Sequence, residues 1–353
     1  MSFKNGMNPD AKRFGTGTKF ISVMDILNNQ YICYDNIRAS VELQDGDIEA
    51  YGVNYGDILF QRSSETLEDI GRANVYLDSK PAIFGGFVIR GKSKDNYNPL
   101  FFRYLLASPT ARKRIIVKGA GAQHFNIGQD GLSKVFIDIP TLKEQKKIGK
   151  LLQCLDERIA TQNKIIDKLQ SLIKGIRHDI FNDIQGEVLA LSNIADIYQP
   201  QTISSSDLTT EGYWVYGANG IIGKYEEYNH ETEQICITCR GNTCGTVNYT
   251  QPKVWITGNS MVINTDKYQR QVNKRFLFHY LSSYNFNSIV SGSGQPQIVR
   301  TPLEKIKVVL PTIEKQVRIA NSIDIVSEKI DTESLVLRLL ENQKQYLLRQ
   351  MFI

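Results

Sequence analysis

Three cysteines in the second half of the chain stand close enough together to suggest metal chemistry. Cys236, Cys239 and Cys244 give the spacing C-x2-C-x4-C, and His230 lies just upstream as a possible fourth zinc ligand. However, Cys236 and Cys239 fall within QICITC, a run typical of a β-strand, where residues three apart face opposite sides. The comparable stretch of the first half, ILFQRSSETLEDIG, has no cysteine. We therefore expect no metal site.

The densest basic segment is SPTARKRIIVKGAG, with Arg112, Lys113, Arg114 and Lys118. Such a segment attracts polyanions, although a solvated basic face explains it equally well. The net charge of +5 resides in residues 1–183, where 26 Lys and Arg stand against 21 Asp and Glu, while residues 184–353 are balanced at 16 against 16. Any general attraction for polyanions therefore belongs to the first half.

Catalytic motifs are missing from the sequence. It has no methyltransferase N/D-P-P-Y/F motif, no glycine-rich dinucleotide loop after a strand and no P-loop, and its four histidines lack ligand spacing. An enzyme with an unrecognised site remains an alternative. The 353 residues suggest two domains, and there is neither an apolar run of 18 residues nor a secretory signal. With five unpatterned cysteines, this predicts a cytoplasmic protein without a membrane span.

One passage occurs twice. IPTLKEQKKIGKLLQCLDERI begins at Ile139, and LPTIEKQVRIANSIDIVSEKI begins 171 residues later at Leu310. Upstream, FRYLLAS corresponds to FHYLSS and GAGAQHFNI to GSGQPQI, while Arg62 and Arg240 are expected at the same place after a β-like run. The chain is therefore a tandem duplication, in which each copy is a globular part followed by a long helix.

Each repeated passage opens a helix with a coiled-coil seam. Apolar residues recur at alternating steps of four and three, and both copies break the pattern at the same step, at Gln162 and Glu333. Thr141 and Thr312 are candidate N-caps. Since roughly 37 residues make a helix of about 55 Å, which is unstable alone, we expect the two helices to pair antiparallel. The seam residues are Ile148, Leu152, Leu155, Ile159, Gln162, Ile166, Leu169, Ile173, Ile319, Ile323, Val326, Ile330, Glu333, Leu337, Leu340 and Leu347.

The globular parts are predicted to be rich in β-strands. YICYDNI, GDILFQ, SKVFIDI and QICITC are among the short runs typical of strands, and helices are expected near 98–117 and 272–290. The fold class is therefore α+β. We expect globular domains at 1–140 and 186–311, with helices at 141–185 and 312–353.

The copies differ at their starts. The second opens with GEVLALSNIADIYQP from Gly186, which predicts a strand and a short helical turn, whereas Met1 aligns near Asp196 or Ile197. We expect that the C-terminal end of the chain supplies the missing strand, or that the natural start lies further upstream.

This doubled order resembles the specificity subunit of type I restriction–modification systems. The resemblance rests on LSKVFIDIPTLKEQKKI and LEKIKVVLPTIEKQVRI with their heptads, and on YWVYGANGIIGKY and GSGQPQI, and it spans nearly the whole chain. It implies a non-catalytic subunit with two target recognition domains, each reading half of a bipartite site in double-stranded DNA. The helices would set the gap between the halves.

The resemblance also implies partners. Two methyltransferase subunits would dock on the core, and motor–endonuclease subunits would join them; S-adenosylmethionine, ATP and Mg would belong to those partners and no cofactor to this chain. A coiled-coil scaffold with two protein-binding domains is the alternative, as is a methylation-only or decoy specificity subunit.

Under this resemblance, the candidate DNA-binding residues are polar side chains in loops and the basic segment. Arginine and amide side chains suit base edges, while the basic segment suits phosphates. The candidates are Arg62, Arg112, Lys113, Arg114, Lys118, Gln123, His124, Asn126, Tyr216, Asn219, Arg240, Asn242, Thr243, Gln295 and Gln297.

Overall fold

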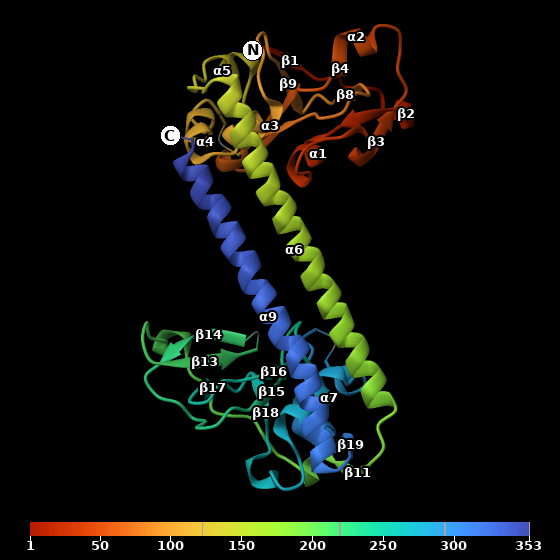
Figure 1. Ribbon diagram of the computed structural model, residues 1–353, viewed down its shortest axis with the longest axis vertical. Helices are drawn as coiled ribbons and strands as arrows, with labels where there is room; N and C mark the ends of the chain where they lie inside the picture. The colour runs from red at the N-terminus through yellow and green to blue at the C-terminus, as the bar shows by residue number, and fades with distance from the viewer. Residues whose placement is uncertain (122, 219, 293, 353) are drawn as a thin grey trace. The chain divides into compact units, whose positions relative to one another are not determined.

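The computed structural model describes residues 1–121, 123–218, 220–292 and 294–352. They divide into two compact units, one formed by Met1–Asn163 with Leu335–Ile353 and the other by Lys164–Ser334. Each unit contains a globular part and a portion of both long helices, α6 (Leu142–Asn182) and α9 (Ile313–Gln350) (Figure 1). The predicted α+β tandem repeat is confirmed.

The first unit is built on two four-stranded sheets. One has the order β1-β9-β5-β7, and the other has the order β3-β2-β8-β4, in which only β2 and β8 run parallel. A third, two-stranded sheet pairs β6 with β10. The strands are β1 (Ser2–Asn5), β2 (Phe14–Ile21), β3 (Ala39–Val41), β4 (Gly52–Val53), β5 (Ile58–Gln61), β6 (Ser63–Ser64), β7 (Ala73–Val75), β8 (Ala82–Phe84), β9 (Val88–Lys92) and β10 (Phe125–Asn126).

The second unit repeats this plan. Its four-stranded sheet β12-β18-β15-β16 corresponds to the first sheet, and in β14-β13-β17 the strands β13 and β17 run parallel, as β2 and β8 do. It has one additional pair, β11 with β19. The strands are β11 (Glu187–Ala190), β12 (Asp196–Tyr198), β13 (Tyr213–Gly217), β14 (Gly220–Tyr225), β15 (Ile235–Thr238), β16 (Val247–Tyr249), β17 (Trp255–Ile256), β18 (Ser260–Asn264) and β19 (Lys307–Leu310).

Short helices pack on these sheets. Those expected near 98–117 are α3 and α4, and the one expected near 272–290 is α7 followed by a 3-10 turn at Phe286–Ile289. Their apolar faces enter the cores: Phe101 and Leu105 of α3, and Phe276 and Leu281 of α7, are buried. The α-helices are α1 (Val23–Asn28), α2 (Asp47–Tyr51), α3 (Pro99–Leu105), α4 (Pro109–Ile116), α5 (Gln129–Ser133), α7 (Lys274–Ser283) and α8 (Arg300–Glu304).

Two predicted strands are wrong. In YICYDNI, Ile32 makes only an isolated bridge with Tyr76, and a 3-10 turn follows at Tyr34–Asn36. The reason is local, because side-chain oxygens of Asn36 and Asp78 accept the backbone N–H groups of Cys33 and Tyr34. In SKVFIDI, no regular structure forms beyond Lys134, since no neighbouring strand pairs with it.

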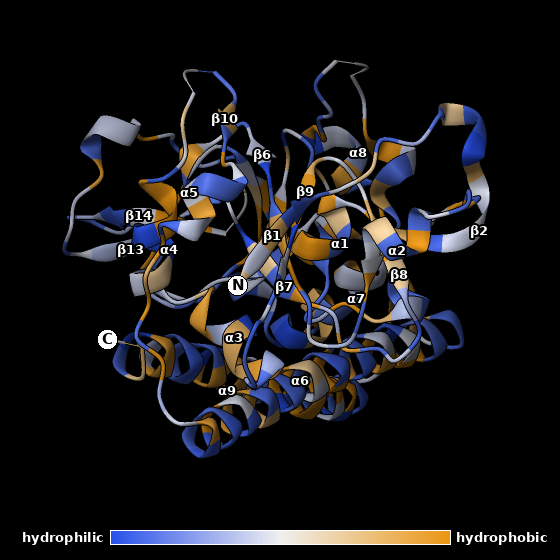
Figure 2. Cartoon of the chain, turned by 90° about the horizontal axis from the view of Figure 1, so that it is seen from above, coloured by the Kyte–Doolittle hydropathy of each residue, from blue (hydrophilic) through white to orange (hydrophobic). Residues whose placement is uncertain are grey.

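The two long helices run antiparallel within each unit. In the first unit Leu152 of α6 and Leu348 of α9 share a core cluster, and the Lys344 Nζ lies 2.6 Å from Asp156 Oδ1. In the second, Phe181 of α6 packs in the core that also contains Ala320 of α9. The predicted seam residues are all buried or half-buried, and Figure 2 shows hydrophobic and hydrophilic residues alternating along both helices.

The repeated glutamine joins each helix to its globular part. Gln316, fully buried, donates its amide to the carbonyls of Pro311 and Gln271, while its oxygen accepts the N–H of Asn273, the N-cap of α7. Gln145 likewise donates to the Pro140 carbonyl and accepts from the N–H of the α3 N-cap, Asn98. The same pair of bonds thus fixes the helix entry in both units.

Replacing Gln316 by alanine should lower the free energy of unfolding of the second unit by about 2–3 kcal/mol, because it leaves buried backbone groups unpaired. Chemical denaturation followed by hydrogen exchange of residues 186–334 measures this change. Gln170→Ala, at an exposed position of α6, is the matched control and should change stability by less than about 0.5 kcal/mol. Equal losses in both variants would contradict this account of the glutamine.

A buried histidine connects three helices of the second unit. Arg177 of α6 donates to His279 Nδ1 at 3.0 Å, so His279 Nε2 carries the proton and donates to Asp324 Oδ1 of α9 at 2.7 Å. The neutral imidazole therefore bridges a cation and a carboxylate. Burial lowers the pKa of His279 to about 4, despite the opposing bond with Asp324.

This site predicts acid sensitivity. Because the folded pKa of His279 lies below its ordinary value of about 6.5, the unfolded chain binds more protons between pH 6.5 and 4. The contribution to stability is complete above pH 6.5, and about 3 kcal/mol should be lost as the pH falls through that window. Thermal unfolding at stepped pH measures it. His279→Gln should reduce the dependence of the unfolding temperature on pH in this window, whereas His178→Gln, at an exposed position, should not.

Candidate nucleic-acid interface

A tight hairpin at residues 120–126 gathers three of the candidate side chains. Ala120 and Asn126 exchange both backbone hydrogen bonds, at 2.9 and 2.8 Å. Gly121 has φ +143°, and a Cβ there would lie 2.1 Å from the His124 carbonyl oxygen, so only glycine fits. The hairpin consequently presents Gln123, His124 and Asn126 as exposed side chains.

The second unit has the same hairpin 171 residues later. Ser291 and Gln297 exchange backbone bonds of 2.8 Å each, and Gly292, with φ +90°, would bring a Cβ within 2.5 Å of the Gln295 carbonyl oxygen. Gln295 and Gln297 are exposed. We call the described residues of these two segments, 120–121 with 123–126 and 291–292 with 294–297, the recognition hairpins. The two hairpins are closed by the same pair of backbone hydrogen bonds, but they carry different side chains.

Each hairpin lies against the loop that leaves the central strand of its main sheet. In the first unit β10 pairs with β6, and Ser63 Oγ donates to Asn126 Oδ1 at 2.5 Å. In the second, Arg240 forms an isolated bridge with Gln297, and the Gly241 N–H donates to the Pro296 carbonyl at 2.9 Å. Asn242 and Thr243 extend this exposed surface. Ser63 was missed because a serine after a strand carries no signal of its own.

Arg62 and Arg240 do not occupy the same place, contrary to the expectation from sequence. In the first unit the N–H of Ile127 donates to the carbonyl of Arg62. In the second unit the matching residue, Ile298, donates its N–H to the carbonyl of Cys239, so Cys239 corresponds to Arg62. Arg240 therefore corresponds to Ser63, one residue further along. Successive residues of extended chain face opposite sides. Accordingly Arg62 is half-buried and donates to the Gly86 carbonyl, while Arg240 is exposed.

Arg112, Lys113 and Arg114 of the basic segment lie in α4, and Lys118 lies in the turn after it. Lys113 and Lys118 are exposed. Arg112 instead donates to the carbonyls of Glu68 and Ile70, and burial lowers its pKa to about 10. Arg114 donates to the Phe136 carbonyl at 2.8 Å. Lys113, Arg114 and Lys118 are therefore exposed, whereas Arg112 is half-buried.

Two further candidates differ from expectation. Tyr216 is buried in a cluster with Val254 and Ile256, and burial raises its pKa, so we leave it out of the proposed contacts. Asn219 lies outside the described residues.

The cysteines face different cores. Cys236, in β15, packs beside Val262 in one cluster, and Cys239, the residue directly after β15, packs in another. His230 is hydrogen-bonded to Tyr198 at 2.8 Å. Within the described ranges, no group of three His, Cys, Asp or Glu side chains is arranged to hold a metal ion. Nor does any described helix have the length and apolar character needed to cross a membrane.

Comparison with known families decides what these repeated units are. The family model of the type I restriction modification DNA specificity domain matches residues 3–171 and again residues 184–342. The chain belongs to this family. It is a type I restriction–modification specificity subunit with two DNA recognition domains, one for each copy of the repeat. The scaffold alternative is therefore not retained.

Individual relatives agree with this membership. A putative type I restriction enzyme MjaX specificity subunit of Methanocaldococcus jannaschii is 28% identical over 330 residues, covering 82% of this chain and 76% of its own. The crystal structure of a type I restriction–modification S subunit from M. genitalium covers 100% of this chain and 93% of its own, with a TM-score of 0.64 at 17% identity. A second solved chain, described in work on complex assembly of the type I system, has a TM-score of 0.56 at 14% identity, covering 98% and 96%. The two structures support the fold alone.

Proposed function

We propose that each unit of this specificity subunit reads one half of a bipartite site in double-stranded DNA, through its recognition hairpin and the adjoining loop. The observation that carries this proposal is one backbone frame presenting His124 and Asn126 in one unit and Gln295 and Gln297 in the other. Amide side chains form bidentate bonds with adenine edges in the major groove. Because the two sets differ, the two half-sites should differ in sequence.

The remaining exposed cations complete the proposed contact surface. Arg240 has the geometry for a guanine edge or a phosphate, and Asn242 and Thr243 flank it. Lys113 and Lys118 would contact phosphates, adding affinity and salt dependence without sequence information. We propose that α6 and α9 act as the spacer that fixes the number of unread base pairs between the halves.

Partner subunits are proposed to dock on the outward faces of these helices. Leu151, Ile165 and Leu172 on α6 are exposed although apolar, and they lie at multiples of seven residues from one another. The same spacing relates three exposed residues on α9, which are Ile325, Leu339 and Tyr346. An apolar stripe outside the seam is the pattern by which a helix receives another helix.

We assign these stripes to two methyltransferase subunits, which motor–endonuclease subunits then join. Catalysis would be carried out by these partners, which would bind S-adenosylmethionine, ATP and Mg. This chain would be a non-catalytic cytoplasmic component. Leu339→Lys combined with Tyr346→Lys should abolish co-purification with the methyltransferase subunit, because two buried apolar contacts become charged. Glu341→Lys, at an exposed position of the same helix, should leave it unchanged. Undiminished co-purification of the double variant would contradict the assignment.

The decisive test is co-expression with a cognate methyltransferase subunit, followed by mapping of methylated adenines in the host DNA. A single bipartite motif with a fixed gap is the expected result. Replacing residues 1–140 by the corresponding part of another specificity subunit should change one half of the motif and keep the gap. A complex that forms without producing any motif would refute the reading role. Cleavage assays with the nuclease subunit would separate full restriction from the methylation-only alternative.

A further inference from the structure

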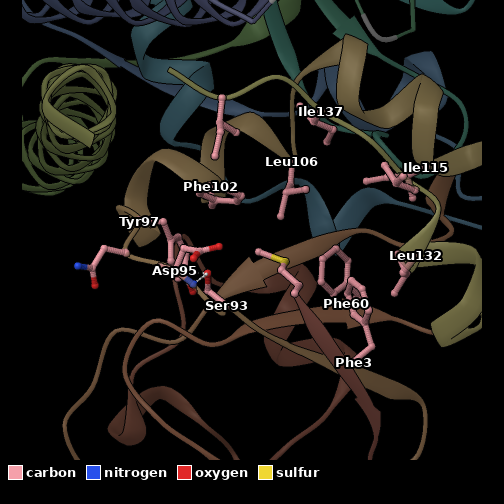
Figure 3. Close-up of a pocket in the computed structure, with 14 residues that line it drawn as sticks. Phe3, Phe60, Ser93, Asp95, Tyr97, Phe102, Leu106, Ile115, Leu132 and Ile137 are labelled. Carbon is pink, nitrogen blue, oxygen red and sulfur yellow. Dashed lines mark hydrogen bonds between the residues drawn. The ribbon is translucent and has the colours of Figure 1, made fainter. Parts of the chain in front are cut away.

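Two pockets of the first unit differ in the character of their walls. The one shown in Figure 3, of about 240 Å³, is lined mostly by apolar side chains such as Phe60. The other, of about 350 Å³, is lined by Arg72, Arg103 and Arg112, and its wall includes one acidic residue, Glu68. We call this second pocket the arginine pocket. Three guanidinium groups beside one carboxylate give it a net positive charge.

Two of these arginines, Arg103 and Arg112, are half-buried and have only neutral hydrogen-bond partners. Arg112 donates to two backbone carbonyls in the segment 68–70, at 2.8 and 2.6 Å, and Arg103 Nε donates to the Gln30 carbonyl at 2.8 Å. Within the described residues, Arg112 Nη1 is buried and has no hydrogen-bond partner. Burial lowers the pKa of both groups, and the charge of Arg72 lowers that of Arg112 further.

The carboxylates near the pocket are engaged with other groups. Asp69 is paired with Arg72 at 2.6 Å. Asp156 accepts a hydrogen bond from the Tyr104 hydroxyl at 2.8 Å, and its other oxygen lies 2.6 Å from the ammonium nitrogen of Lys344. Among the described residues, no carboxylate forms an ion pair with either half-buried arginine. Their charge is therefore held partly out of water without an anion, which costs free energy.

The second unit shows that the fold does not require these arginines. Counted from the N-caps of α3 and α7, Arg103 corresponds to Phe278. By the pairing of β5 with β7 and of β15 with β16, Arg72 corresponds to Thr246. In place of α4, the helix that carries the third arginine, the second unit has the turn Phe286–Ile289, which contains no cationic residue. The arginines thus need an explanation other than folding.

The C-terminal end of the chain fixes the two helices that carry Arg103 and Arg112. Phe352 packs with Phe101 of α3, and its carbonyl accepts a hydrogen bond from Thr110 Oγ1 of α4 at 2.8 Å. The expectation that the C-terminal end supplies the missing strand of the first copy is therefore wrong. Because α3 and α4 are both held by this contact, the half-buried arginines are preorganised.

We propose that the arginine pocket binds a phosphate group, a role beyond the proposed reading of DNA by the hairpins. Guanidinium groups match phosphate oxygens with paired, charge-assisted hydrogen bonds. The anion would also balance the charge of the two half-buried arginines. The pocket falls within the range of small-molecule sites, roughly 300–1,000 Å³, which leaves room for the rest of a phosphate ester. A free phosphate ester and a backbone phosphate of DNA present the same oxygens, and both are possible sources.

Inorganic phosphate is the first probe, added to the full chain at constant ionic strength with chloride as the balancing anion. Amide hydrogen exchange of residues 67–73 and 103–112 should slow in a saturable manner, by about threefold or more. Arg72→Gln and Arg103→Gln should each raise the phosphate concentration needed for half-maximal protection by about tenfold, because each removes a charged hydrogen-bond donor. Arg158→Gln, at an exposed position of α6, removes the same charge and should leave this concentration unchanged.

Two further probes identify the source of the phosphate. Protection at lower concentration by AMP than by inorganic phosphate would support the site and assign it to a free phosphate ester. Protection by duplex DNA of unrelated sequence, with none by AMP beyond that of inorganic phosphate, would support the site and assign it to the DNA backbone. Absence of saturable protection by all three probes, or equal protection in the unsubstituted chain and both pocket variants, would overturn the proposal. Neither result would bear on base reading by the hairpins.

Discussion

A specificity subunit carrying both Gln295→Ala and Gln297→Ala should lose base preference in one half of its methylation motif and retain the other half. A bidentate amide contact contributes about 1–3 kcal/mol of discrimination against the wrong base, so each lost contact should relax preference by roughly 5- to 150-fold. The fold should persist, because both side chains are exposed and the hairpin is closed by backbone bonds. Methylation mapping of the co-expressed complex measures the change.

The matched experiment uses the other hairpin. Gln123→Ala with Asn126→Ala should alter the opposite half of the motif, although Asn126 also accepts a bond from Ser63. Gln269→Ala, at an exposed position of the second unit away from its hairpin, is the control and should leave the motif intact. If both halves survive either double substitution, the hairpins do not read bases.

Asp324→Ala should lower the free energy of unfolding of the second unit by about 3–5 kcal/mol, the largest single effect on stability that we expect. Asp324 accepts two hydrogen bonds from Arg275 and one from the buried His279. Burial alone would raise its pKa, but these bonds outweigh burial and lower it. Without the carboxylate, Arg177 and Arg275 would face a histidine with no anion beside them.

Protease susceptibility and hydrogen exchange, read separately in the two units, measure this loss. The second unit should open more readily while Met1–Asn163 keeps its protection. Asp331→Ala, at an exposed position about two turns further along α9, is the control and should behave as the unsubstituted chain. A comparable loss in both variants would mean that the hydrogen bonds of Asp324 with Arg275 and His279 do not stabilise the second unit.

The long helices were predictable from sequence because their pattern is repeated many times. Seven successive seam positions, from Ile148 to Leu169, recur 171 residues later from Ile319 to Leu340, so no single residue decides the prediction. Thr141 could be predicted as an N-cap, and the structure adds a reciprocal bond with Glu144. Gln145 and Gln316 were visible as repeated residues, yet their partners lie on α3 and α7, which local pattern does not reveal.

The errors arose where a neighbouring group decides the conformation. SKVFIDI has the composition of a strand, but a strand needs a partner, and composition does not show whether one is present. Tyr216 was predicted as a DNA-binding residue, whereas β13 directs it into a core. The one-residue offset between Arg62 and Arg240 follows from the hydrogen bonds of Ile127 and Ile298. Sequence alignment does not contain these hydrogen bonds.

The recognition hairpins have a consequence for how target preference changes over time. Their closure depends on backbone bonds and one glycine of positive φ in each, and the exposed side chains at the tip contribute nothing to it. Substitutions at Gln123, His124 or Gln295 should therefore be nearly neutral for folding. If the hairpins read bases as we propose, single mutations would give access to new base preferences, without the compensating changes that altering a packed binding site would require.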